Sequence, residues 1–162
     1  MRYDFNGSMP REVLESYLAR AVTLGDVIHS PTQDDDIRMV LNIGAKFLGR
    51  AAAYWRPEPD DDAHFAACAA FAAKVHHRDP DVIVQGCIFE AVYPGVDAIP
   101  IPPWVFEAFA LPVEQRNFSY DRMLSPEFRQ AYHWNHEGSV PDISQLESQL
   151  WFYYRARRYI DA

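Results

Sequence analysis

Two charged side chains of opposite sign each end an apolar run of this sequence. Glu90 closes the run 82–89, and Arg50 closes the shorter run 45–49. If the two runs are neighbouring strands, Glu90 is partly desolvated, as suits a general acid. A salt bridge between Glu90 and Arg50 is the more frequent use of such a pair. Arg50 could also hold an anionic or hydroxyl-rich ligand through its fork of N–H donors.

Other candidate residues follow from where ligands bind in parallel sheets, which is at the carboxyl ends of the strands. The residues in question are Asp26 and His29 after the first predicted strand, Tyr54 and Trp55 after the second, Tyr93 after the third, and Trp104 in the segment beyond. Aromatic faces of this kind suit stacking against sugar rings. Packing in the core is the commoner use of such rings.

The sequence does not form the motifs of metal, phosphate or cofactor sites. His133, His136 and Glu137 are close together, but their spacing differs from that of His-Glu-x-x-His zinc sites. No glycine-rich phosphate loop, Gly-x-Ser-x-Gly motif or Cys–His pair stands out. The sequence therefore predicts no metal and no cofactor.

Helix and strand patterns alternate in the part of the chain that carries these residues. Asp34, Asp35 and Asp36 favour a helix start, and Gly44 suits the end of that helix. Predicted strands cover 20–24, 45–50 and 82–89, and predicted helices cover 10–19, 34–44, 64–77, 103–109 and 142–160. This alternation predicts an α/β fold with parallel strands and outer helices. We expect one domain over 1–162, with a long irregular insertion over 94–141.

Composition limits the partners and the compartment. The net charge is −8 and the pI is near 5.1, so neither nucleic acid nor an anionic membrane is an expected partner. Cys68 and Cys87 lie in apolar runs and are expected to be buried free thiols. No signal-peptide core and no apolar run of about 18 residues is present. These features predict a cytoplasmic protein.

Two segments resemble parts of a known fold. Residues 34–51 resemble a helix and second strand, and residues 79–90 a helix end and third strand, of (β/α)8 barrels of the glycoside-hydrolase-like type, which include uncharacterised bacterial members. The resemblance covers roughly residues 20–160 and implies three to four β/α units of such a barrel. It further implies a carbohydrate-active protein, with Glu90 as acid/base, Arg50 orienting it, and Asp26 as a weak candidate for the second carboxylate.

The length of the chain leaves an alternative open. A complete barrel needs about 250 residues, so the chain would be a fragment that pairs with a missing C-terminal half, a half-barrel that pairs with another copy, or an open β/α sandwich. The last predicted helix carries Trp151 to Tyr154 and Tyr159, more rings than one packing stripe requires. The alternative function is therefore a non-catalytic β/α assembly module that forms a homo-oligomer through this helix.

Overall fold

The structure, a computed structural model, describes residues 8–53, 61–127, 132–134 and 138–162. The chain divides into two compact units. Unit 1 comprises residues 1–53, 65–87 and 162, and unit 2 comprises residues 54–64 and 88–161. The expectation of a single domain over the whole chain stays a prediction.

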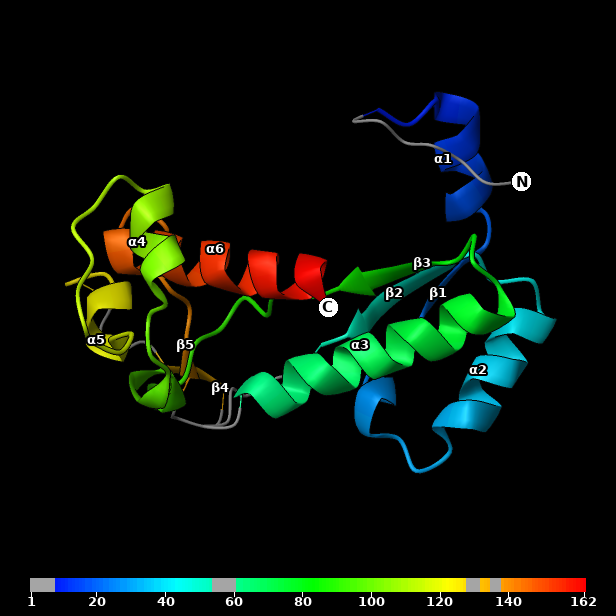
Figure 1. The fold of residues 1–162 in the computed structure, drawn as a ribbon, viewed down its shortest axis with the longest axis horizontal. Helices are drawn as coiled ribbons and strands as arrows, with labels where there is room; N and C mark the ends of the chain where they lie inside the picture. The colour runs from blue at the N-terminus through cyan, green and yellow to red at the C-terminus, as the bar shows by residue number, and fades with distance from the viewer. Residues whose placement is uncertain (1–7, 54–60, 128–131, 135–137) are drawn as a thin grey trace. The chain divides into compact units, whose positions relative to one another are not determined.

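Unit 1 is built on a parallel sheet of three strands (Figure 1). Its elements are α1 (Arg11–Leu18), β1 (Ala21–Thr23), the 3-10 helix η1 (Val27–His29), α2 (Gln33–Asn42), β2 (Phe47–Ala52), α3 (Asp61–Arg78), whose first turn belongs to unit 2, and β3 (Ile83–Gly86). The strand order is β1-β2-β3, with Ala21 beside Phe47 and Phe47 beside Ile83. The predicted α/β fold with parallel strands is confirmed.

The two helical crossovers cover the sheet. Connections between parallel strands are almost always right-handed, so α2 and α3 fall on one face when the strand order runs in one direction; Figure 1 shows both on the same side of the strands. The central strand β2 is buried at Leu48, Ala51 and Ala52, as expected of a strand in a covered parallel sheet. Gly44 ends α2 with a φ of 80°, the left-handed conformation predicted for this position.

An ion pair ties the start of β2 to the turn after α3. Lys46 donates a hydrogen bond to the carboxylate of Asp79, and the backbone N–H of Asp81 donates to the same carboxylate at 3.1 Å. Both side chains of the ion pair are partly buried. The hydrogen bond from Lys46 lowers the pKa of Asp79 below its ordinary value.

This lowered pKa predicts an acid-sensitive contribution to the stability of unit 1. Because the pKa is lower in the folded than in the unfolded chain, the contribution is complete above about pH 4 and is lost as pH falls through the folded-state value. We expect Asp79→Asn to cost about 1 kcal/mol at pH 7 and less as pH falls. Urea unfolding followed by far-ultraviolet circular dichroism at several pH values measures this. A cost that does not change with pH would contradict it.

Unit 2 packs its other elements around its last helix. Its elements are the 3-10 helix η2 (Pro94–Ala98), α4 (Pro103–Ala108), α5 (Tyr120–Met123), β4 (Tyr132–Trp134), β5 (Gly138–Ser139) and α6 (Leu146–Asp161). β4 and β5 pair antiparallel. The core consists of buried residues from these elements and the segments between them: Val92, Val96, Ile99, Ile101, Val105, Phe106, Phe118, Met123, Leu124, Leu150, Trp151 and Tyr154. The predicted irregular segment 94–141 thus supplies much of this core.

The aromatic residues of α6 pack within unit 2. Trp151 and Tyr154 are buried, and Phe118 contacts both rings. Tyr153 packs against Trp104, and Tyr159 lies edge-on to His64. The surplus of rings that suggested an interface between copies is therefore largely accounted for inside the unit. Homo-oligomer formation stays a prediction.

None of the helices in the described residues combines the length and apolarity that a membrane crossing requires.

Cys68 and Cys87 are both free thiols. Cys68 is buried as predicted, whereas Cys87, which directly follows β3, is only half-buried.

Candidate functional site

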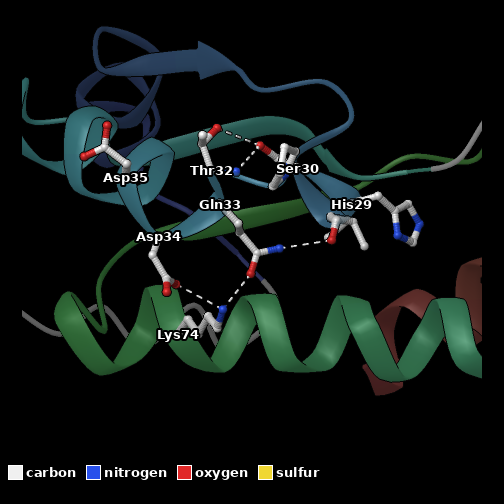
Figure 2. A pocket seen from close by; sticks show the side chains of 9 residues that line it. His29, Ser30, Thr32, Gln33, Asp34, Asp35 and Lys74 are labelled. Carbon is white, nitrogen blue, oxygen red and sulfur yellow. Dashed lines mark hydrogen bonds and ion pairs between the residues drawn. The ribbon is translucent and has the colours of Figure 1, made fainter.

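A polar pocket lies in unit 1, beside the loop that follows β1 (Figure 2). Its volume is about 520 Å³, within the range of small-molecule sites. The lining comes from η1, the turn after it, the start of α2 and one residue of α3. The lining residues are Ile28, His29, Ser30, Pro31, Thr32, Gln33, Asp34, Asp35 and Lys74. The pocket thus follows the carboxyl end of a parallel strand, where ligands bind in such sheets.

Gln33 and Lys74 connect the walls of this pocket. The side-chain amide of Gln33 donates to the carbonyl oxygens of Val27 at 3.0 Å and Ile28 at 3.1 Å. The ammonium group of Lys74 donates to Oε1 of Gln33 at 2.9 Å and to Oδ1 of Asp34 at 3.0 Å. Figure 2 shows these bonds joining η1, α2 and α3. The walls are therefore held in place without a ligand.

Hydroxyl groups fix the turn that leads into α2. Ser30 donates to Oδ2 of Asp36 at 2.6 Å, and Thr32 donates to the same oxygen at 3.2 Å. The backbone N–H of Thr32 donates to Oγ of Ser30 at 3.2 Å. Carboxylates in the first turn of a helix are favoured by its dipole. The local sequence therefore explains why this edge of the pocket is preformed.

The charges of the lining select among ligands. The formally charged groups of the lining are two carboxylates, Asp34 and Asp35, and one ammonium group, Lys74. Asp35 is further paired with Arg38 at 2.7 Å, and both lining carboxylates are exposed. The carboxylates of Asp34 and Asp35 can only accept hydrogen bonds, so they offer no donor to a phosphate or carboxylate ligand. A neutral ligand with many hydroxyl groups would find both donors and acceptors.

Two of the predicted catalytic residues have left-handed backbone conformations. Asp26 has a φ of 58° and follows β1, and Arg50 has a φ of 55°. Both residues are exposed, and both belong to unit 1. Arg50 does not end its strand as predicted, because β2 continues to Ala52. Arg50 instead lies within the central strand, where it is the one exposed residue.

The prediction that Glu90 closes the third strand is wrong. β3 ends at Gly86, so the apolar run continues beyond the strand and Glu90 is exposed. Glu90 belongs to unit 2 and Arg50 to unit 1. A salt bridge between them and an acid/base role for Glu90 stay predictions.

Two of the four aromatic residues that were predicted to stack against a ligand are among the described residues. Tyr93 is buried, and Trp104 stacks on Tyr154 with ring centroids 5.9 Å apart. Both rings are thus used in packing, the commoner alternative for such residues. Tyr54 and Trp55 lie outside the described residues. Among the nominated site residues that the structure describes, His29 is the one that lines the pocket.

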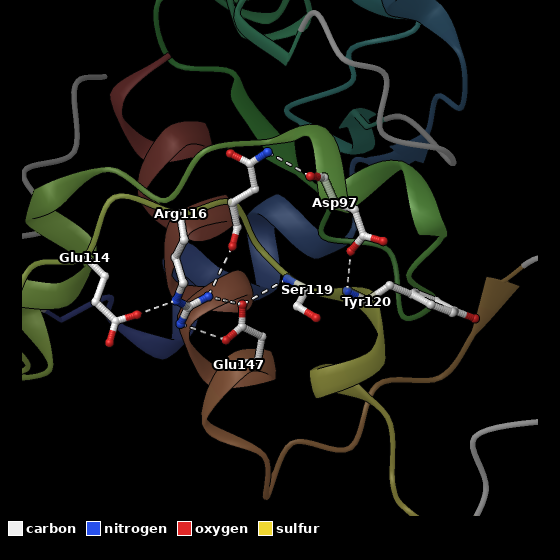
Figure 3. Close-up of polar contacts among 7 residues, drawn as sticks. Asp97, Glu114, Arg116, Ser119, Tyr120 and Glu147 are labelled. Atoms are coloured by element: carbon white, nitrogen blue, oxygen red, sulfur yellow. Dashed lines mark hydrogen bonds and ion pairs between the residues drawn. The ribbon is translucent and has the colours of Figure 1, made fainter.

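A second polar cluster, in unit 2, is structural (Figure 3). Arg116 donates to both carboxylate oxygens of the buried Glu147, at 2.7 and 3.0 Å, and to Glu114 at 2.7 Å. The backbone N–H of Ser119 also donates to Glu147 at 3.0 Å. These bonds raise the pKa of Arg116, mainly through the hydrogen bond to Glu147. The cluster fastens the segment before α5 to the first turn of α6.

Sequence reasoning missed Gln33 and Lys74. Gln33 carried a weak signal, because it begins the helix that follows the loop of Asp26 and His29. Lys74 carried none, because it lies in the middle of an Ala-rich helix and reaches the pocket only after the sheet has formed. Parallel crossovers bring together residues that are distant in sequence.

Among the described residues, no cluster of three or more histidine, cysteine, aspartate or glutamate side chains is placed to hold a metal ion. His136 and Glu137 lie outside the described residues, as does the side chain of His133.

No protein family, curated protein or solved structure matches the chain.

Proposed function

We propose that the chain is a carbohydrate-active protein that binds a neutral sugar in the pocket beside β1. The observation that carries the proposal is the lining itself, in which seven of nine residues are polar. Apolar ligands require a mostly apolar wall, and the lining carboxylates accept hydrogen bonds that an anion cannot donate. A neutral polyol is the ligand class that this lining favours.

The donors and acceptors in the pocket suit such a ligand. An ammonium group has three N–H donors, and Lys74 directs two of them to Gln33 and Asp34. The third is the donor that a sugar hydroxyl would accept from. The carboxylates of Asp34 and Asp35 would accept from neighbouring hydroxyls, and the imidazole of His29 would supply a polar edge.

In the same proposal, the chain is a segment of a glycoside-hydrolase-like (β/α)8 barrel. This description is supported by the parallel sheet with helical crossovers and by the position of the pocket after a strand. In this proposal Asp26, which follows β1, and Arg50 of β2 contact the ligand. An experimental structure in which a further strand pairs antiparallel with β3 would contradict the barrel.

Chemical-shift titration of the labelled chain with maltose, cellobiose and glucose 6-phosphate tests the proposal. We expect the neutral disaccharides to shift the amide signals of residues 28–35, and the phosphate to bind more weakly. Loss of the hydrogen bond from Lys74 in Lys74→Met should weaken sugar binding about tenfold.

Arg78→Met is the matched control, because Arg78 is an exposed cation of the same helix that does not line the pocket. It should leave the affinity unchanged. Shifts that avoid residues 28–35, or tighter binding of the phosphate than of both neutral sugars, would contradict the proposal.

A further inference from the structure

The central strand of the sheet contains a bulge opposite a single residue. Leu48 pairs with Val84 and Ala52 pairs with Gly86, so Gln85 alone faces the three residues 49–51 of β2. A bulge of this kind removes backbone groups from the ladder of the neighbouring strand. The backbone N–H of Arg50, in the middle of the bulge, therefore needs another acceptor.

The side chain of Gln85 supplies that acceptor. Its Oε1 accepts a hydrogen bond from the backbone N–H of Arg50 at 3.0 Å. The same oxygen would lie 3.6 Å from a methyl group placed on Gly49, so the side chain of Gln85 reaches across the neighbouring strand. The hydrogen bond thus replaces a rung of the ladder with a side chain.

The bulge decides which way Arg50 faces. Leu48, Ala51 and Ala52 are buried, whereas Arg50 between them is exposed. A charged residue within a covered parallel strand is tolerated only where the backbone turns it out to water. The left-handed conformation of Arg50 makes that turn.

Ordinary backbone geometry does not explain this conformation. The other two non-glycine residues with positive φ in the described part of the chain are Asp26 and Ala110. Asp26 is of a type that tolerates the left-handed region, and Ala110 directly follows the C-cap of α4, where that region is common. Arg50 lies inside a strand. Strained conformations of this kind cost about 1–3 kcal/mol and persist only where neighbours hold them.

We propose that Gln85 is a positioning residue, which locks the left-handed conformation of Arg50 and thereby holds its side chain out of the covered strand, from where the proposed function has it contact the ligand. The ligand contact rests on the proposed function; the lock itself does not. Gln85 touches no ligand in this account and acts only through Arg50.

Amide hydrogen exchange of the full-length labelled chain tests the lock. In Gln85→Ala, exchange of the Arg50 amide should become about tenfold faster. Gln85→Glu keeps an acceptor oxygen and should restore protection. Gln115→Ala replaces an exposed glutamine of unit 2 and should leave the Arg50 amide unchanged. An Arg50 amide that exchanges equally fast with and without Gln85 would overturn the proposal.

Sugar affinity tests the consequence. The dissociation constant for whichever of maltose and cellobiose binds tighter is measured in Arg50→Ala, Gln85→Ala and the double variant. We expect Gln85→Ala to weaken binding, Gln85→Glu to restore it, and the double variant to match Arg50→Ala alone. Additive effects would overturn the positioning role. If wild-type chain binds neither sugar, the proposed function fails, while the exchange measurement still decides whether Gln85 holds Arg50.

Discussion

Asp61→Ala is expected to lower the free energy of unfolding of unit 2 by about 3–5 kcal/mol, because it breaks a buried ion pair. Asp61 and Arg155 are 5% and 3% exposed, and Oδ1 of Asp61 accepts a hydrogen bond from Arg155 at 2.6 Å. Oδ2 accepts from the hydroxyl of Tyr154 at 2.5 Å. Alanine would take the acceptor away from a buried guanidinium and a buried hydroxyl at once.

The surroundings of the ion pair make relaxation difficult. The guanidinium of Arg155 lies over the rings of Trp151 and Tyr159, and it also donates to the hydroxyl of Tyr159 at 3.0 Å. Burial raises the pKa of Tyr154, and its hydrogen bond to Asp61 raises it further. The charge of Arg155 cannot reach water without moving these rings, so the loss should approach the upper part of the range.

Urea unfolding followed by tryptophan fluorescence measures the effect, since Trp104 and Trp151 both belong to unit 2. Asp161→Ala is the matched control, because Asp161 pairs with Arg157 in an exposed ion pair on the same helix. Exposed pairs contribute about 0–1 kcal/mol. A loss for Asp61→Ala no larger than that of the control would show that water reaches the pair. Asp61→Leu combined with Arg155→Met should recover much of the loss, because an apolar pair leaves no buried charge.

The elements of unit 1 could be predicted because their signals are local. The three aspartates before Ile37 and the glycine at 44 mark the two ends of α2 within a few residues of the helix. The apolar runs before and after it then become the strands of a parallel sheet. Each such signal depends on backbone geometry that neighbouring residues determine.

The ends and irregularities of the strands could not be predicted in the same way. The apolar run up to Phe89 gives no sign that β3 ends at Gly86, because apolar residues in an extended strand and in a buried loop look alike in sequence. The bulge at Arg50 depends on the residue opposite it in β3. A prediction based on one strand at a time contains no information about that partner.

The polar contacts depend even more on distant residues. Glu147 lies three residues after Ser144, the spacing of a capping box, but its carboxylate accepts from Arg116 and from the backbone of Ser119. Asp61 begins α3 and pairs with an arginine 94 residues away. Side chains with several possible partners take those that tertiary packing brings near, and only the folded chain shows which these are.

Gly138 is a position where adding one methyl group should be costly. A Cβ atom there would lie 2.6 Å from Cε1 and 2.8 Å from Cζ of Tyr93, well inside van der Waals contact. Tyr93 is buried, so its ring has little room to turn aside. We expect Gly138→Ala to lower the free energy of unfolding of unit 2 by about 1–3 kcal/mol, the usual cost of overpacking.

The backbone cannot relieve this clash, because β5 is fastened next to Gly138. The N–H of Val92 donates to the carbonyl of Ser139 at 2.8 Å, and the N–H of Ser139 donates to the carbonyl of Val92 at 3.0 Å. Both residues are buried. Moving Gly138 away from Tyr93 would break one of these bonds or pull Val92 out of the core, so the ring and the glycine have to fit as they are.

Urea unfolding of Gly138→Ala, with Tyr93→Leu and the double variant, separates overpacking from other effects. Gly25→Ala is the control, since a Cβ atom there would have no atom within 4 Å, and its effect should be small. If overpacking is the cause, Gly138→Ala should cost much less in the Tyr93→Leu background, because leucine lacks the ring atoms that the methyl group meets. If the cost is the same in both backgrounds, it arises from the backbone conformation at 138, and the close approach to Tyr93 does not determine why glycine is needed there.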